Sequence, residues 1–192
     1  MYRYFKTLTY SFALLMAVPF AHAQPAPFLL DQGQSIVGFT YDLSGTPTEG
    51  TMPVSKAAIS LDLDNLPAST VDVTLDPTQA KAGYFWATNA MRSEQVLAAD
   101  NHPTIRFVST SVRGDLNGGT VSGNLTVRGV TRPVILAAQL YRQSGTEVTD
   151  RDRLQILLTG RIDRNAFGAS GFPGFVGPKL DLRIVARIER AG

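Results

Sequence analysis

Residues 179–189, KLDLRIVARIE, carry the clearest alternation of apolar and polar side chains in the chain. One face of this stretch is wholly apolar and consists of Leu180, Leu182, Ile184, Ala186 and Ile188. Successive side chains of a β-strand point to opposite faces, so a period of two is typical of a strand with one buried face and one face in water. The stretch therefore predicts an antiparallel strand that packs one side against a core.

The same period recurs along the chain from Ser35 onward. Residues 133–141 are apolar on both faces, so the pattern there does not indicate which side is buried. Turn-forming clusters rich in Asn, Gly and Pro separate the segments. About eight strands are predicted in this way. The remaining alternating segments are 37–43, 59–64, 71–75, 105–107, 121–127 and 154–159.

Residues 78–102 interrupt the strand pattern, because they lack alternation and contain no proline. They predict one or two short helices, with Ser93 as a cap for a turn over Glu94–Leu97. Eight or so amphipathic strands must bury their apolar faces against one another, in a sandwich or a closed barrel. We expect an all-β fold, an extended antiparallel β-barrel, whose interior is wide enough for packed side chains or one small ligand.

The N-terminus has the layout of a secretory signal peptide. Arg3 and Lys6 precede an apolar run from Phe12 to Phe20, which is followed by the small-residue sequence Ala-His-Ala. Residues 1–23 are therefore expected to be removed, which predicts a soluble periplasmic or secreted protein. Residues 24–34 are expected to form a lead-in segment, and residues 35–192 to form the barrel domain.

Composition excludes several classes of function. Removing residues 1–23 takes away two of the 18 basic residues and no acidic residue, so 16 of each sign remain. A net charge near zero gives no electrostatic reason to expect nucleic acid as a partner. The chain has no cysteine, and His102 is the one histidine outside the predicted signal peptide. Thiolate and multi-histidine metal sites are therefore excluded, and we expect no metal and no cofactor.

The chain offers little for catalysis. Residues 168–171, GASG, only superficially resemble a nucleophile elbow, because the closing glycine is missing at position 172. His102 precedes a proline at the start of a predicted strand, and Asp62 and Asp64 fall on the polar face of another. The expectation is a binding protein and not an enzyme, with no catalytic residues.

Residues 121–134, VSGNLTVRGVTRPV, are similar to the G-x-L-T-x-R-G-V-T-x-P-V signature of the YceI-like, polyisoprenoid-binding family. Residues 91–93, 102–110 and 164–168 resemble further elements of that family in the same order. The resemblance implies a lipocalin-like barrel around an apolar tunnel for an isoprenoid chain. Many members place a histidine near the end of the first strand, where this chain has Tyr41-Asp42-Leu43, so no head-group contact transfers there.

The alternation and the resemblance together suggest candidate lipid-binding residues. Arginine can fork a diphosphate or a carbonyl head group, although paired or solvated arginine is commoner. The glycine-rich and phenylalanine-rich residues 167–177 predict a loop that either plugs the barrel end or opens as a lid. Candidates for the mouth or head-group site are Trp86, Arg92, Asn165, Phe172 and Phe175. Candidates for the tunnel lining are Phe39, Tyr41, Phe107, Leu125, Val127, Ile156, Leu158, Phe167, Leu182 and Ile184.

The predicted function is to bind a long isoprenoid lipid of polyprenyl or quinone type, as a carrier or a sequestering protein, with transient contact to a membrane or a membrane protein. The alternative is an interaction module with a fully packed core, which binds a membrane redox or envelope partner. The two hypotheses differ in whether the barrel interior is hollow or filled.

Overall fold

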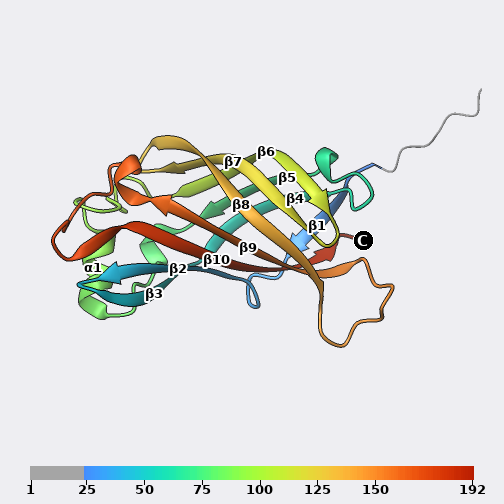
Figure 1. Ribbon diagram of the computed structural model, residues 1–192, viewed down its shortest axis with the longest axis horizontal. Helices are drawn as coiled ribbons and strands as arrows, with labels where there is room; N and C mark the ends of the chain where they lie inside the picture. The colour runs from blue at the N-terminus through green and yellow to red at the C-terminus, as the bar shows by residue number, and fades with distance from the viewer. Residues whose placement is uncertain (1–23) are drawn as a thin grey trace, which may run out of the picture.

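The computed structural model describes residues 24–192, and the predicted signal peptide lies outside this range. Ten strand segments make one antiparallel sheet (Figure 1). Across residues 24–192, helical structure is limited to α1 (Phe85–Arg92) and three 3-10 turns, η1 (Leu66–Ala68), η2 (Pro77–Gln79) and η3 (Arg164–Phe167). The strands are β1 (Ala26–Leu30), β2 (Ile36–Leu43), β3 (Thr46–Met52), β4 (Val54–Leu61), β5 (Thr70–Leu75), β6 (Ile105–Asp115), β7 (Gly118–Val127), β8 (Val130–Arg142), β9 (Arg153–Asp163) and β10 (Val176–Arg190).

The sheet closes through β10, which is the longest strand. One edge of β10 pairs with β9, and the other edge pairs with β2 along one part and with β1 along the next. Strands β1 and β2 therefore share one position in the ring, and β3 and β4 share another, since β1 pairs with β4 and β2 with β3. Ten segments thus fill eight positions, and the closed antiparallel barrel of about eight strands is confirmed.

Residues 24–34 are more than the expected lead-in, because Ala26–Leu30 form strand β1. This strand pairs with both β4 and β10, and Phe28 is buried against Ile59 and Ile188. The segment is too short to show an alternating pattern, and its backbone pairing stabilises it instead. The barrel domain therefore starts before Ser35.

The interrupted region contains one helix, α1, as predicted, together with the short turn η2. Ser93 ends α1, and the predicted turn over Glu94–Leu97 follows it, because the Ser93 carbonyl accepts from the Val96 amide at 3.1 Å. The Ser93 hydroxyl does not cap this turn, since it donates to the Ala90 carbonyl instead. The ambiguous stretch 133–141 lies in β8. There Leu136 faces the interior, while Ile135 on the outer face is 67% exposed.

Candidate functional site

A cavity of about 580 Å³ runs along the barrel interior, and its wall is almost entirely apolar. The buried apolar residues form three separate clusters around it, one of which contains Leu125 and Phe167, another Phe28 and Ile188, and the third Tyr41. A volume of this size is typical of small-molecule sites. The interior is therefore hollow, which argues against the alternative of a fully packed core.

Every predicted tunnel residue lies on the cavity wall. The alternation succeeds because the period of two assigns each side chain to the inside or the outside of a closed sheet. The wall also contains residues that were not singled out, and the region without alternation contributes five of them, Ala87, Ala90, Met91, Val96 and Leu97. The predicted residues on the wall are Phe39, Tyr41, Phe107, Leu125, Val127, Ile156, Leu158, Phe167, Leu182 and Ile184.

Two phenylalanine rings lie flat against the wall because glycines leave room for them. The Phe39 ring lies over Gly50 on the adjacent strand, where an added Cβ would overlap it. The Phe107 ring lies over Gly123 in the same way, so the glycine of the family signature accepts a side chain from β6. Without these glycines, both rings would be displaced from their present positions on the wall. The glycines therefore help to keep the cavity open.

The predicted mouth residues divide into two groups. Trp86, Phe172 and Phe175 lie at one end of the cavity wall. Arg92 is not part of that wall, since its Nε and Nη2 atoms donate to the Ala80 carbonyl at 3.2 and 2.7 Å. Asn165 is exposed, and its backbone amide donates to the Asp163 carboxylate.

Arg164 is the most buried of the arginines in the segments that resemble the family motifs, and its guanidinium is bonded to backbone. Its Nε donates to the Gly177 carbonyl at 2.9 Å, and its Nη2 to the Val176 carbonyl at 2.8 Å. Its Nη1 donates to the carbonyls of Ala169 and Gly171. Burial lowers the pKa of Arg164 from its ordinary value, although a guanidinium stays charged at any physiological pH. Arg164 thus holds the loop 168–177 in place.

Arg128 and Arg132 also donate to backbone carbonyls near the same end of the barrel. Arg128 Nη1 bonds the Val96 carbonyl at 2.8 Å and the Gly168 carbonyl at 3.1 Å, and Arg132 Nε bonds the Ala166 carbonyl at 3.3 Å. These pairings are between residues far apart in sequence, so no local pattern could have revealed them. The motif arginines therefore position the mouth loops.

Tyr41 is one of the few residues with a polar side-chain atom on the largely apolar wall. Its hydroxyl donates to the Ala82 carbonyl at 2.9 Å, which ties β2 to the segment before α1. Burial raises the pKa of the Tyr41 hydroxyl, and the nearby Tyr84 adds to the effect. The hydroxyl is therefore neutral and satisfied, and it does not act as a base.

A family model described as the YceI-like domain matches residues 28–188. The chain belongs to the YceI-like family. Among YceI-like relatives, Protein YceI of Escherichia coli is 30% identical over 135 residues, which are 70% of this chain and 70% of that protein. A UPF0312 protein of Vibrio vulnificus is 30% identical over 155 residues, 79% of this chain and 81% of its own length.

Solved structures share the YceI-like fold at lower identity. BcnA of Burkholderia cenocepacia superposes with a TM-score of 0.72 at 17% identity, over 83% of this chain and 99% of that one. A structure described as a polyisoprenoid binding domain from Saccharophagus degradans superposes with a TM-score of 0.61 at 12% identity, over 86% of this chain and 99% of that domain. Within residues 24–192, none of the helices has the length and apolar character needed to cross a bilayer.

Proposed function

We propose that this YceI-like barrel binds a long isoprenoid lipid, of polyprenyl or quinone type, inside its cavity and acts outside the cytoplasm as a carrier or sequestering protein. The observation that carries the proposal is the hollow apolar interior. The signal-peptide pattern of residues 1–23 supports export. The polyisoprenoid-binding relative of the same fold supports the ligand class.

The size of the cavity limits how much of a ligand it encloses. At about 30 Å³ for each water-sized group, 580 Å³ accommodates about 20 such groups. That is about four isoprene units, so a longer tail has to extend out of the mouth or displace wall side chains. Affinity should therefore rise with tail length and level off beyond about this size.

Energetics favour reversible carriage over storage. A methylene moved from water into the cavity contributes ~0.8 kcal/mol, but one that leaves a bilayer gains almost nothing because it was already in an apolar medium. Affinity in competition with a membrane must come from the shape of the wall. A protein of this kind can both load from and release to a bilayer.

The test is native mass spectrometry of protein gently purified from the compartment to which it is exported, followed by lipid extraction. We expect a bound species whose extracted lipid is a polyprenyl or quinone-type isoprenoid. The control is the delipidated protein, reloaded with either an isoprenoid alcohol or an unbranched alcohol of equal carbon number. Protein that remains lipid-free in both experiments, or that prefers the unbranched chain, would contradict the proposal.

A further inference from the structure

Five aromatic side chains gather at one end of the barrel, and we call them the aromatic rim. The segment that leads into α1 provides Tyr84, Phe85 and Trp86, and the loop before β10 provides Phe172 and Phe175. Both segments lie at the left-hand end of the barrel in Figure 1, together with the β2–β3 turn. Two backbone hydrogen bonds join these pieces, from Gly171 N to Gln95 O at 2.9 Å and from Ser44 N to Phe175 O at 2.8 Å.

The rim is both exposed and continuous with the cavity. Phe85 is 82% exposed, Phe175 66% and Trp86 57%. Trp86, Phe172 and Phe175 also line the cavity, and Tyr84 stacks on Trp86 with ring centroids 5.6 Å apart. Large apolar side chains in water that surround the end of an apolar cavity mark a surface with a partner.

The rim is held outward by fixed contacts. The Arg164 guanidinium bonds four carbonyls of the loop 168–177, which carries Phe172 and Phe175. The Tyr41 hydroxyl bonds the Ala82 carbonyl, immediately before the segment that carries Tyr84. These bonds pre-organise the rings at the tip, so binding a partner loses little conformational entropy in ordering them.

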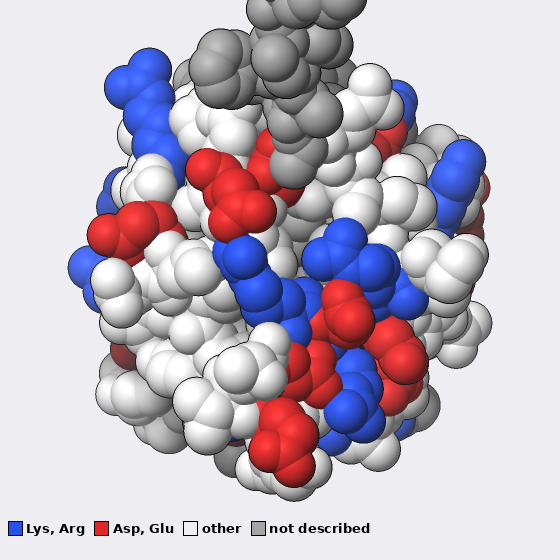
Figure 2. Space-filling model, turned by 90° about the vertical axis from the view of Figure 1, so that its right-hand side faces the viewer, with Lys and Arg blue, Asp and Glu red and all other residues white. Residues whose placement is uncertain are grey.

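The chemistry of the tip identifies the partner as a lipid surface. The segments that carry the rim and the neighbouring β2–β3 turn, residues 82–90, 165–178 and 43–48, contain no Asp, Glu, Lys or Arg. Charged side chains begin at their border, where Lys81 and Arg92 lie beside Phe85 and Arg128 bonds the Gly168 carbonyl. At the opposite end, acidic and basic side chains interleave in a patch on the exposed face (Figure 2). Tyr, Trp and Phe favour the boundary between head groups and acyl chains, where the uncharged segments that carry the rim lose no ion hydration.

We propose that the aromatic rim docks on a lipid bilayer, with its rings at the head-group boundary and the cavity opening directly onto the acyl region. This rests on the proposed function, because a tail that passes from bilayer to cavity through this contact never crosses water. The rim carries no charge, so docking depends on apolar burial and not on anionic lipid.

Trp86 is the one tryptophan of the chain, so its fluorescence reports on the rim alone. The experiment mixes the protein, without isoprenoid, with phosphatidylcholine vesicles and measures both co-sedimentation and Trp86 emission. We expect the protein to sediment with the vesicles, Trp86 emission to shift to the blue, and brominated acyl chains to quench it. High salt should leave the binding unchanged, because no ion pairs are involved.

The matched variants compare rings on the rim with an equally exposed apolar residue elsewhere. Phe85→Ser and Phe175→Ser should each weaken vesicle binding about tenfold, the effect of losing most of one buried aromatic side chain. Ile135→Ser, on the outer wall of β8, should leave it unchanged. Native mass spectrometry of the same variants reports whether the cavity still takes up lipid, which separates failure of docking from failure of the proposed function.

Three results would overturn the proposal. The first is no binding to vesicles, which would assign the rim to a protein partner or to a second copy of the chain. The second is binding that requires anionic lipid and is abolished by salt. The third is a loss on Ile135→Ser that equals the loss on Phe175→Ser, since the barrel would then lie on its side.

Discussion

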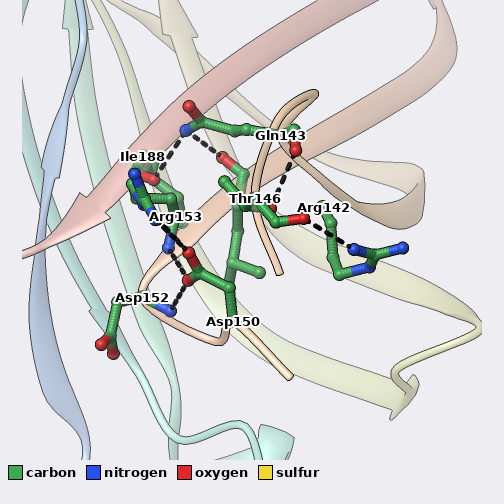
Figure 3. Close-up of polar contacts among 8 residues, drawn as sticks. Arg142, Gln143, Thr146, Asp150, Asp152, Arg153 and Ile188 are labelled. Atoms are coloured by element: carbon green, nitrogen blue, oxygen red, sulfur yellow. Dashed lines mark hydrogen bonds and ion pairs between the residues drawn. The ribbon is translucent and has the colours of Figure 1, made fainter. Parts of the chain in front are cut away.

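The two ends of the barrel differ in how they meet water. At the end opposite the rim, the β8–β9 loop satisfies its polar groups with one another (Figure 3). Gln143 Nε2 donates to the carbonyls of Leu154 and Ile188, and the Asp150 carboxylate accepts from the amides of Asp152 and Arg153. The rim, in contrast, leaves large aromatic rings exposed to water.

Exposed and buried charged side chains therefore have different structural roles in this fold. At the charged end, Arg151 pairs with Asp64 at 2.8 Å and both side chains are largely in water. Exposed pairs of this kind contribute at most about 1 kcal/mol. At the rim end, Arg164 has no carboxylate partner in its hydrogen bonds and organises backbone carbonyls. The charged end exposes its ion pairs to water, and the buried arginine maintains the geometry of the mouth.

The largest expected effect comes from removing that buried arginine. Arg164→Met leaves the carbonyls of Ala169, Gly171, Val176 and Gly177 without their donor, and should cost ~3–5 kcal/mol in the free energy of unfolding. Arg151→Met, at the charged end, should cost less than ~1 kcal/mol. Denaturant unfolding of both variants measures the difference, and equal losses would show that the two ends do not differ as described.

A smaller effect is expected from substituting the glycines of strand β7. One of them, Gly123, lies against a ring of the cavity wall, and another, Gly118, lies toward the charged end. Gly123→Ala places a methyl group where the Phe107 ring lies, so it should destabilise the protein by ~1–3 kcal/mol and reduce lipid uptake. Gly118→Ala, toward the charged end, meets only the Ala138 carbonyl at 3.6 Å and should change stability by less than ~0.5 kcal/mol. Unfolding together with native mass spectrometry checks both, and unchanged uptake in Gly123→Ala would contradict the role given to Phe107.

The smallest effect is the response to acid. Backbone hydrogen bonds from Arg153 and Asp152 lower the pKa of Asp150, so the loop is stabilised above the ordinary carboxyl pKa of about 3.9 and loses this stabilisation as pH falls through the lowered value. At the rim, Gly171 N donates to a carbonyl, which does not titrate. In an NMR titration, the amides of Asp152 and Arg153 should shift in this acid range while Gly171 does not. A shift of Gly171 in step with them would show that the ends are coupled.

The strand pattern predicted more of the site than the motif did. Inward residues of the alternating strands reached the cavity wall, because a closed sheet leaves only two directions for a side chain; the exception is Leu154, which packs in the buried cluster with Phe28 and Ile188. The motif also showed where the arginines lie, but not that Arg92 and Arg164 bond backbone carbonyls across loops. Such pairings depend on contacts between distant segments, which one sequence does not encode locally.

Two further features were beyond sequence reasoning for related physical reasons. Strand β1, which pairs with β4 and β10, buries Phe28 but leaves Leu29 exposed, although both side chains are apolar. Its five residues therefore show no alternation of apolar and polar types in the sequence. The exposure of Phe85 and Phe175 could not be foreseen either, because aromatic residues in a chain are more often buried than left in water.

The most direct test of the central claim compares adjacent positions on β9 that face opposite sides of the barrel wall. Leu158 lines the cavity, whereas Thr159 is exposed on the outer face. Denaturant unfolding of wild type, Leu158→Trp and Thr159→Trp is measured with and without a long-chain isoprenoid alcohol. At a hundredfold excess over Kd, ligand should stabilise wild type and Thr159→Trp by ~2.7 kcal/mol, and Leu158→Trp, whose indole occupies the cavity, by far less. Absence of any stabilisation in wild type, or equal stabilisation of both variants, would contradict binding inside the barrel.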